Sequence, residues 1–116
     1  MPQATIYHNP RCSKSRQTLD LLKSNQVDAE IVEYLKTPPT AAELKDILSM
    51  LGLKPRDLMR KKEAEYKALG LSDETLTDDE LIQAMVEHPR LIERPIVITG
   101  NKAALGRPPE QVLDIL

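Results

Sequence analysis

The chain has no tryptophan and no phenylalanine, and it has only three tyrosines among 116 residues. Proteins that bind single-stranded nucleic acid stack the bases on aromatic side chains, so this scarcity argues against that class. The formal net charge of -2 gives no overall basic footprint for nucleic acid either. We therefore expect a core of aliphatic side chains and no nucleic-acid partner.

Long apolar runs are also missing. No segment approaches the roughly 20 apolar residues that cross a bilayer. The N-terminal residues lack the basic-then-apolar layout of a secretory signal. The single cysteine, Cys12, cannot form an internal disulfide, which agrees with a reducing compartment. We expect a cytoplasmic protein with no membrane partner, folded as one domain over residues 1–116.

A metal site is not expected either. One cysteine and two histidines, His8 and His88, show no spacing of metal ligands. A phosphatase-type loop needs an arginine six positions after the cysteine, but position 18 is Thr18, and the arginine that follows Cys12 is Arg16, only four positions on. The sequence therefore predicts neither a metal site nor a tyrosine-phosphatase loop.

Hydrophobic periodicity and breakers predict alternating elements. In chain order these are a strand at 4–7, a helix at 13–25, a strand at 29–35, helices at 41–51, 54–59, up to 70 and at 78–87, strands at 96–99 and 102–105, and a helix at 110–116. Thr40 with Glu43 and Thr77 with Glu80 match capping boxes, and Val112, Leu113 and Leu116 should face inward. This β-α-β, helices, β-β-α order predicts an α/β, thioredoxin-like three-layer fold with a mixed four-stranded sheet and an enlarged helical insertion.

The most informative segment surrounds Cys12, which falls between a predicted strand and a predicted helix. Unpaired backbone N–H groups at a helix start lower a thiol pKa and also bind oxyanions. Arg11, Lys14 and Arg16 add positive charge along the chain. We therefore predict that Cys12 is a nucleophilic thiolate beside an anion site, rather than a small buried hydrophobe.

Two further residues near Cys12 leave two interpretations open. His8 either tunes the thiol or simply makes a backbone hydrogen bond in its turn. Ser15 either bonds the thiolate or is an ordinary serine of the first helical turn. Farther along the chain, Arg60, Arg94 and Arg107 stand beside breakers or motifs rather than on a helix face. Arginine forks suit tetrahedral oxyanions, although most arginines are simply solvated.

Together these motifs resemble the glutaredoxin-coupled (ArsC-like) arsenate reductase family. The resemblance rests on Tyr7-His8-Asn9-Pro10-x-Cys12-x-x-Ser15-Arg16, Leu58-x-Arg60, Arg94-Pro95-Ile96-Val97 and Arg107-Pro108, in the same order and spacing over nearly the whole chain. The chain differs from the best-known arsenate-reducing members in its residues next to the cysteine, Arg11-Cys12-Ser13-Lys14.

The resemblance implies an oxidoreductase with a role in arsenic detoxification. Cys12 would attack arsenate and form a covalent arsenic adduct, glutathione would attack that adduct as co-substrate, and glutaredoxin would reduce the mixed species to release arsenite. By position, Arg60, Arg94 and Arg107 would bind the oxyanion, His8 would lower the Cys12 pKa, Ser15 would bond its sulfur, and Pro95 would be a cis-proline facing the site. No cofactor would be bound, and we expect a monomer.

Two other functions remain open. A glutathione-linked thiol oxidoreductase with another substrate would need Cys12 but not three arginines. A non-enzymatic module of the same fold, regulating RNA polymerase, is a further alternative. Such modules carry a Cys-x-x-Cys redox switch, and Ser15 stands in place of the second cysteine here.

Overall fold

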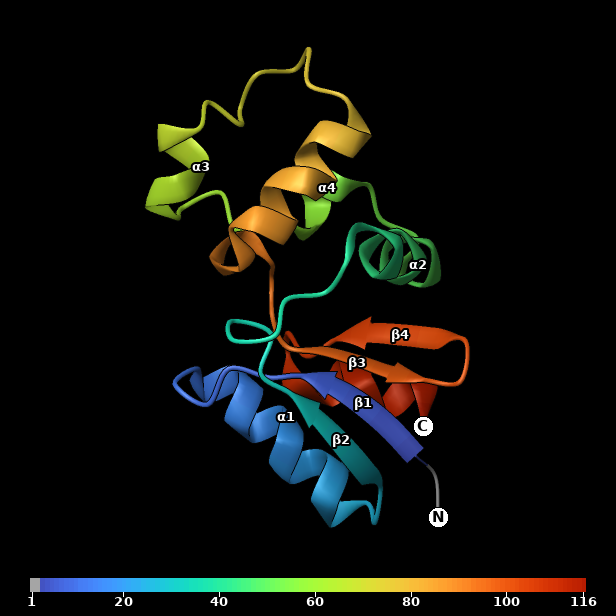
Figure 1. The fold of residues 1–116 in the computed structure, drawn as a ribbon. Helices are drawn as coiled ribbons and strands as arrows, with labels where there is room; N and C mark the ends of the chain where they lie inside the picture. The colour runs from blue at the N-terminus through green and yellow to red at the C-terminus, as the bar shows by residue number, and fades with distance from the viewer. Residues whose placement is uncertain (1–2) are drawn as a thin grey trace. The chain divides into compact units, whose positions relative to one another are not determined.

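The computed structural model describes residues 3–116. Met1 and Pro2, which belong to the predicted domain and to the N-terminal segment searched for a signal, lie outside the described residues. The chain divides into two compact units, and we call residues 3–37 with 94–116 the sheet unit and residues 38–93 the helical unit (Figure 1). The single domain expected over 1–116 stays a prediction.

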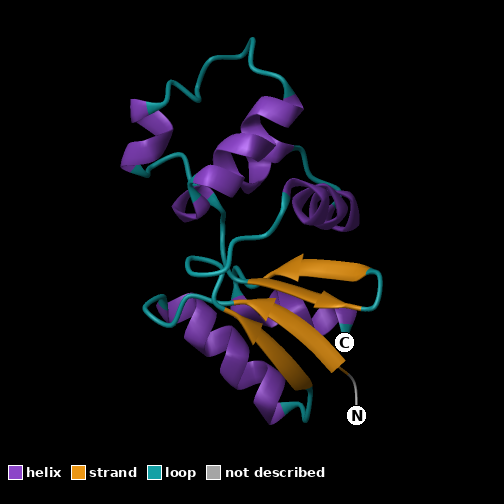
Figure 2. Ribbon diagram, in the orientation of Figure 1, coloured by secondary structure: helices purple, strands orange, loops and turns teal. Residues whose placement is uncertain are grey.

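The sheet unit contains a mixed four-stranded sheet in the order β2-β1-β3-β4 (Figure 2). Strand β1 (Gln3–Tyr7) runs parallel to β2 (Asp28–Val32) and antiparallel to β3 (Ile96–Thr99). Strand β4 (Lys102–Leu105) returns antiparallel to β3. The turn between them includes Gly100 at φ 60°, a left-handed conformation that glycine adopts without a Cβ clash. The predicted sheet is confirmed.

Helix α1 (Ser13–Ser24) and the 3₁₀ helix η3 (Pro109–Ile115) cover one face of this sheet. Their buried core is aliphatic and consists of Ala4, Ile6, Leu22, Val27, Val97 and Val112. The alternation along β1 explains it, because Ala4 and Ile6 point to the α1 face while Gln3 and Thr5 point to the other. This core anchors the C-terminal end of β1, from which the Cys12 segment leads into α1.

Two predictions in the sheet unit are wrong in detail. Strand β2 ends at Val32 rather than Leu35, because residues 33–37 form a turn in which the carbonyl of Glu33 accepts from two backbone N–H groups. The last helix is 3₁₀ rather than α. With three residues per turn, Val112 and Ile115 share the inner face, so Leu113 and Leu116 stay about 40% exposed (38% and 41%).

The helical unit consists of α2 (Ala41–Leu51), η1 (Pro55–Leu58), α3 (Ala64–Ala68), α4 (Asp78–Glu87) and η2 (Pro89–Leu91). Both predicted capping boxes are present, at the starts of α2 and α4. Gly52 ends α2 at φ 69°. The segment predicted as a helix at 54–59 is a single 3₁₀ turn, whose proline occupies its first position.

Helix α4 lies against α2, η1 and η2 within this unit. Its buried face presents Leu81, Ile82 and Met85. Arg56 of η1 ties the α3 region to this core, because its guanidinium donates to the Tyr66 hydroxyl (3.0 Å) and to the carbonyls of Leu71 and Asp73. Within residues 3–116, no helix is long and apolar enough to cross a membrane.

Candidate active site around Cys12

Cys12 is the N-cap residue of α1, with extended backbone angles (φ -94°, ψ 123°). A tight turn delivers it there: the Cys12 N–H donates to the Asn9 carbonyl (3.0 Å), and the Asn9 side-chain oxygen accepts the Arg11 N–H (3.0 Å). Asn9 is thus a positioning residue, which the sequence analysis named only as part of the motif around Cys12. An asparagine before a helix start can form such a turn, and that was the available signal.

The first turn of α1 contains no acidic residue. No side-chain carboxylate in this turn therefore offsets the partial positive charge of the helix start, which lies at Cys12. Burial alone raises the pKa of the Cys12 thiol, which is 8% exposed. The backbone N–H groups of Ser15 and Lys14 and the charges of Arg94 and Arg107 outweigh burial and hold the pKa below its ordinary value.

Arg107 reaches Cys12 from the far end of the sequence. Its Nη2 lies 3.8 Å from the Cys12 sulfur, and its Nε donates to the Arg94 carbonyl at 2.7 Å. The peptide bonds Arg94–Pro95 and Arg107–Pro108 are both cis, the first as the resemblance implied. The structure therefore brings Cys12, Arg94, Pro95 and Arg107 together inside the sheet unit.

His8 and Ser15 form a buried pair beside this group. The His8 Nδ1 lies 2.6 Å from the Ser15 hydroxyl oxygen, which also accepts the Asn9 N–H at 3.1 Å. Burial lowers the pKa of His8, the nearby Glu33 raises it, and Lys23 and Arg16 lower it further. The net lowering of its pKa favours neutral His8 near neutral pH, and the expected effect of His8 on the Cys12 pKa stays a prediction.

Ser15 acts on Cys12 through its backbone rather than through the expected bond from its hydroxyl to the sulfur. Its hydroxyl pairs with His8 and Asn9, while its backbone N–H lowers the Cys12 pKa. A serine in the first helical turn presents both groups at once, and sequence alone does not assign them.

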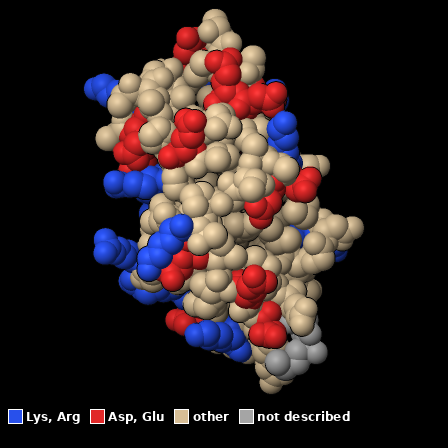
Figure 3. Space-filling view, viewed as in Figure 1, with Lys and Arg blue, Asp and Glu red and all other residues tan. Residues whose placement is uncertain are grey.

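The expected role of the neighbouring cations is wrong in its emphasis. Arg11, Lys14 and Arg16 are exposed, and the Arg16 guanidinium donates to the Pro10 carbonyl at 2.9 Å. The side-chain charges that lower the Cys12 pKa come from Arg94 and Arg107. Arg107 is exposed as well, but its Nη2 lies only 3.8 Å from the Cys12 sulfur, and the Coulomb interaction between two charges grows as their distance shrinks. Lys and Arg side chains nevertheless gather on the surface around the start of α1 (Figure 3).

Arg60 belongs to the helical unit and has a carboxylate for a neighbour. Its Nη1 lies 2.5 Å from Glu63 Oε1, and Glu63 also lies 3.8 Å from Arg90. Hydrogen bonds between Arg60 and Leu91 and between Leu58 and Glu93 fix the backbone around it. The role of Arg60 toward Cys12 stays a prediction, and the sequence analysis missed its ion pair with Glu63, although the i,i+3 spacing was the available signal.

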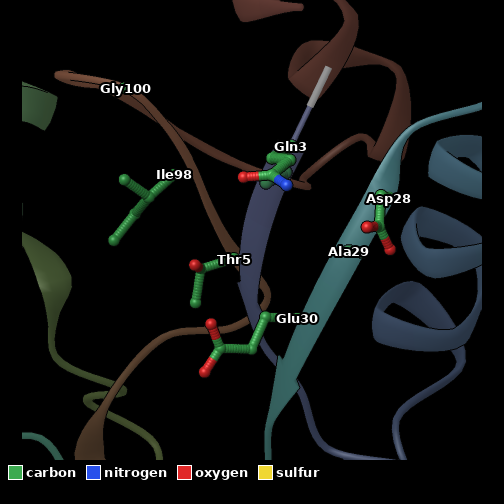
Figure 4. A pocket seen from close by; sticks show the side chains of 8 residues that line it. Gln3, Thr5, Asp28, Ala29, Glu30, Ile98 and Gly100 are labelled. Carbon is green, nitrogen blue, oxygen red and sulfur yellow. The ribbon is translucent and has the colours of Figure 1, made fainter. Parts of the chain in front are cut away.

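A separate hollow of about 400 Å³ lies at the other end of the sheet, where β1 and β2 begin. Figure 4 shows Thr5, Glu30 and Ile98 among its lining side chains. It offers two carboxylates, of Asp28 and Glu30, and the hydroxyl of Thr5, but no thiol or imidazole. Across residues 3–116 there is no group of three or more His, Cys, Asp or Glu side chains suited to a metal ion. The chemistry-bearing residues therefore concentrate at Cys12.

Comparison with known proteins agrees with this location. The uncharacterized protein YfgD of Escherichia coli (strain K12) is 59% identical over 98% of this chain and 97% of its own length. An arsenate reductase of Neisseria meningitidis is 51% identical over the full length of both. The solved structure of an arsenate reductase from Vibrio cholerae superposes with a TM-score of 0.97, at 52% identity over 99% of this chain and 98% of that one.

The Vibrio cholerae structure has the same α/β, thioredoxin-like arrangement, so the predicted fold class is confirmed. The family model named ArsC matches residues 7–115, which include Cys12 and all three predicted arginines. The chain therefore belongs to the ArsC family.

Proposed function

We propose that this protein reduces arsenate to arsenite with glutathione and glutaredoxin as electron donors. The observation that carries the proposal is the Cys12 sulfur at a helix start, 3.8 Å from the Arg107 guanidinium and with a lowered pKa. A thiolate is the nucleophilic form of cysteine. The arsenate reductase names of relatives at 45–51% identity support the substrate.

In the first step, the Cys12 thiolate attacks arsenic and forms a sulfur–arsenic bond, while one arsenate oxygen leaves as water after protonation. Arg94 and Arg107 stabilise the negative oxygens with charge-assisted hydrogen bonds. We assign Arg60 the same role. Ser15 and His8 keep the cysteine in its thiolate form, and Pro95 shapes the wall beside it.

In the next steps, the glutathione thiol displaces a second oxygen as water and becomes bonded to arsenic. A glutaredoxin thiolate then attacks the glutathione sulfur. The electrons of the sulfur–arsenic bond stay on arsenic, which is reduced from As(V) to As(III), and a glutaredoxin–glutathione disulfide forms. Water releases arsenite from Cys12 and restores the thiol. The chain supplies one thiol, and glutathione and glutaredoxin supply the others, so the reaction needs no bound cofactor. We place it in the cytoplasm and propose that the enzyme is a monomer.

The test is arsenate-dependent NADPH consumption with glutathione, glutaredoxin and glutathione reductase. Wild type should turn over, and Cys12→Ser should lose turnover while keeping its fold. Ser13→Ala is the matched control, because Ser13 is exposed next to Cys12 and should retain turnover. Wild-type protein that shows a reactive Cys12 but no arsenate turnover would refute the substrate.

A second candidate is a glutathione-linked thiol oxidoreductase acting on a larger anionic partner. The exposure of Arg11 and Lys14 beside Cys12 favours it, because these cations face solvent, where carboxylates of a glutathionylated protein would meet them. Arginine variants separate the two candidates: loss of Arg94 or Arg107 should reduce arsenate turnover more than reduction of a mixed disulfide.

A further inference from the structure

Gly106 immediately precedes Arg107 and is buried against two other parts of the sheet unit. A β-carbon added at position 106 would lie 2.7 Å from Pro95 Cγ and 3.1 Å from Thr18 Cγ2, and it would be closer still to Thr18 Oγ1. No left-handed backbone angle explains the glycine, since the positive-φ glycines are Gly52, Gly70 and Gly100. Close approach of neighbouring groups is therefore the reason that position 106 lacks a side chain.

Neither neighbour of Gly106 can yield easily. Thr18 is fully buried, and its hydroxyl donates to the Lys14 carbonyl at 2.8 Å, one turn earlier in α1. Pro95 is buried, and its carbonyl accepts the Gly106 N–H at 3.0 Å. Since the crowding atoms are packed and hydrogen-bonded, a side chain at 106 must displace its own backbone.

That backbone continues into Arg107, whose guanidinium lies beside both Cys12 and Arg94. It lies 3.8 Å from the Cys12 sulfur and donates to the Arg94 carbonyl at 2.7 Å. Coulomb attraction between two charges falls with distance, and outward movement of the guanidinium also admits water. Displacing residue 106 therefore weakens the stabilisation of the Cys12 thiolate.

We propose that Gly106 is a positioning residue of the Cys12 site: its missing side chain lets Thr18 and Pro95 close around it and sets Arg107 against the sulfur. The proposal deepens the proposed function, because Arg107 is assigned there to the oxyanion. The positioning of the sulfur, however, can be measured without arsenate.

The experiment is a pH titration of thiolate absorbance at 240 nm, together with the rate of alkylation by iodoacetamide, on the full chain. In Gly106→Ala we expect a Cys12 midpoint about one pH unit above wild type, which is about a tenfold loss of thiolate below both midpoints. Gly100→Ala is the matched control. It strains a positive-φ turn where no atom lies within 4 Å of the new methyl, so it should cost stability and leave the midpoint unchanged.

A rescue variant separates positioning from general loss of packing. Gly106→Ala combined with Thr18→Ala removes both Thr18 atoms that crowd the new methyl, so the midpoint should move back toward wild type. If Gly106→Ala does not fold, Thr18→Val is the alternative. It places a larger methyl group where the Thr18 hydroxyl lies against Gly106, so we expect a smaller rise in the Cys12 midpoint. A folded Gly106→Ala or Thr18→Val protein with a wild-type midpoint would overturn the proposal.

The readout also separates this proposal from the proposed function. A raised midpoint in Gly106→Ala, with no arsenate turnover even in wild type, would keep the positioning role and refute the substrate. Wild-type arsenate turnover with an unchanged Gly106→Ala midpoint would support the substrate and refute the positioning role.

Discussion

The two units differ in the charge at their helix starts and in the group that lies beside one arginine of each. In the helical unit, the starts of α2 and α4 carry first-turn carboxylates, and Arg60 lies against Glu63. In the sheet unit, the start of α1 has no acidic residue, and Arg107 lies beside a thiol. The first-turn carboxylates of α2 and α4 complete capping boxes, whereas the start of α1 and the charge of Arg107 lower the pKa of the Cys12 thiol. The neighbour of each cation, rather than its residue type, thus decides its role.

The largest expected effect comes from removing the cation that faces the thiol. Arg107→Ala should raise the Cys12 pKa and lower arsenate kcat/KM by about 100-fold, as loss of one donor to a developing oxyanion does. Arg107→Lys should recover only part of this, because lysine lacks the planar fork. Steady-state kinetics and the thiolate titration together measure both effects.

The control for this variant is Lys102→Ala, which removes the same charge from the exposed start of β4. It should keep wild-type kinetics. Equal losses in both variants would mean that net charge matters and that the placement of Arg107 beside Cys12 does not.

The pH dependence should come next in size. Because the folded-state pKa of Cys12 is lowered, the reactive fraction should fall about tenfold per pH unit below that pKa. The same shift contributes stability that is fully present above the unfolded value of about 8.5 and is lost as pH falls through the folded pKa. Denaturant unfolding at a series of pH values measures this effect. The free energy of unfolding of wild type should exceed that of Cys12→Ser by more at high pH than at low pH. An increase in the wild-type advantage at lower pH would contradict it.

How much the sequence predicts depends on how local the determining contacts are. The capping boxes span three residues, and both predictions are confirmed. Cys12 and Arg107 are 95 positions apart, so no periodicity connects them, and only the resemblance placed them in one site. The close approach of Gly106 to Thr18 and Pro95 is equally non-local. The 3₁₀ geometry of η3 escaped prediction because apolar spacings of three and four overlap in so short a segment.

A smaller effect should follow when the Arg60 ion pair is broken. Glu63→Gln keeps the shape of the side chain but removes the charge that lies 2.5 Å from Arg60. If Arg60 binds the oxyanion, arsenate no longer competes with this carboxylate, and KM should fall by roughly fivefold, about 1 kcal/mol for a partly buried pair. Competition by phosphate should strengthen equally.

Arg60→Ala is the control that shows whether Glu63→Gln changes KM through Arg60. It should raise KM, and adding Glu63→Gln to it should then change nothing further, because the two act through one contact. An unchanged KM in Arg60→Ala would remove Arg60 from the site. A normal Arg60 effect with an increased KM in Glu63→Gln would instead make Glu63 a residue that orients Arg60.

The smallest expected effect comes from making the start of α1 resemble those of α2 and α4. Ser13→Glu introduces a first-turn carboxylate at an exposed position directly after Cys12. The new charge should offset the helix dipole and raise the Cys12 pKa, which should lower the alkylation rate about threefold near neutral pH. High salt should reduce this difference between the variant and the wild type, because it screens the charge. Glu43→Gln is the reciprocal change in α2. It keeps an acceptor for the capping box but removes the charge that favours that helix start, so it should lower the Tm and leave alkylation of Cys12 unchanged. If Ser13→Glu leaves the alkylation rate unchanged at low salt, the helix start contributes little, and the arginines from the far end of the chain account for most of the thiolate stabilisation.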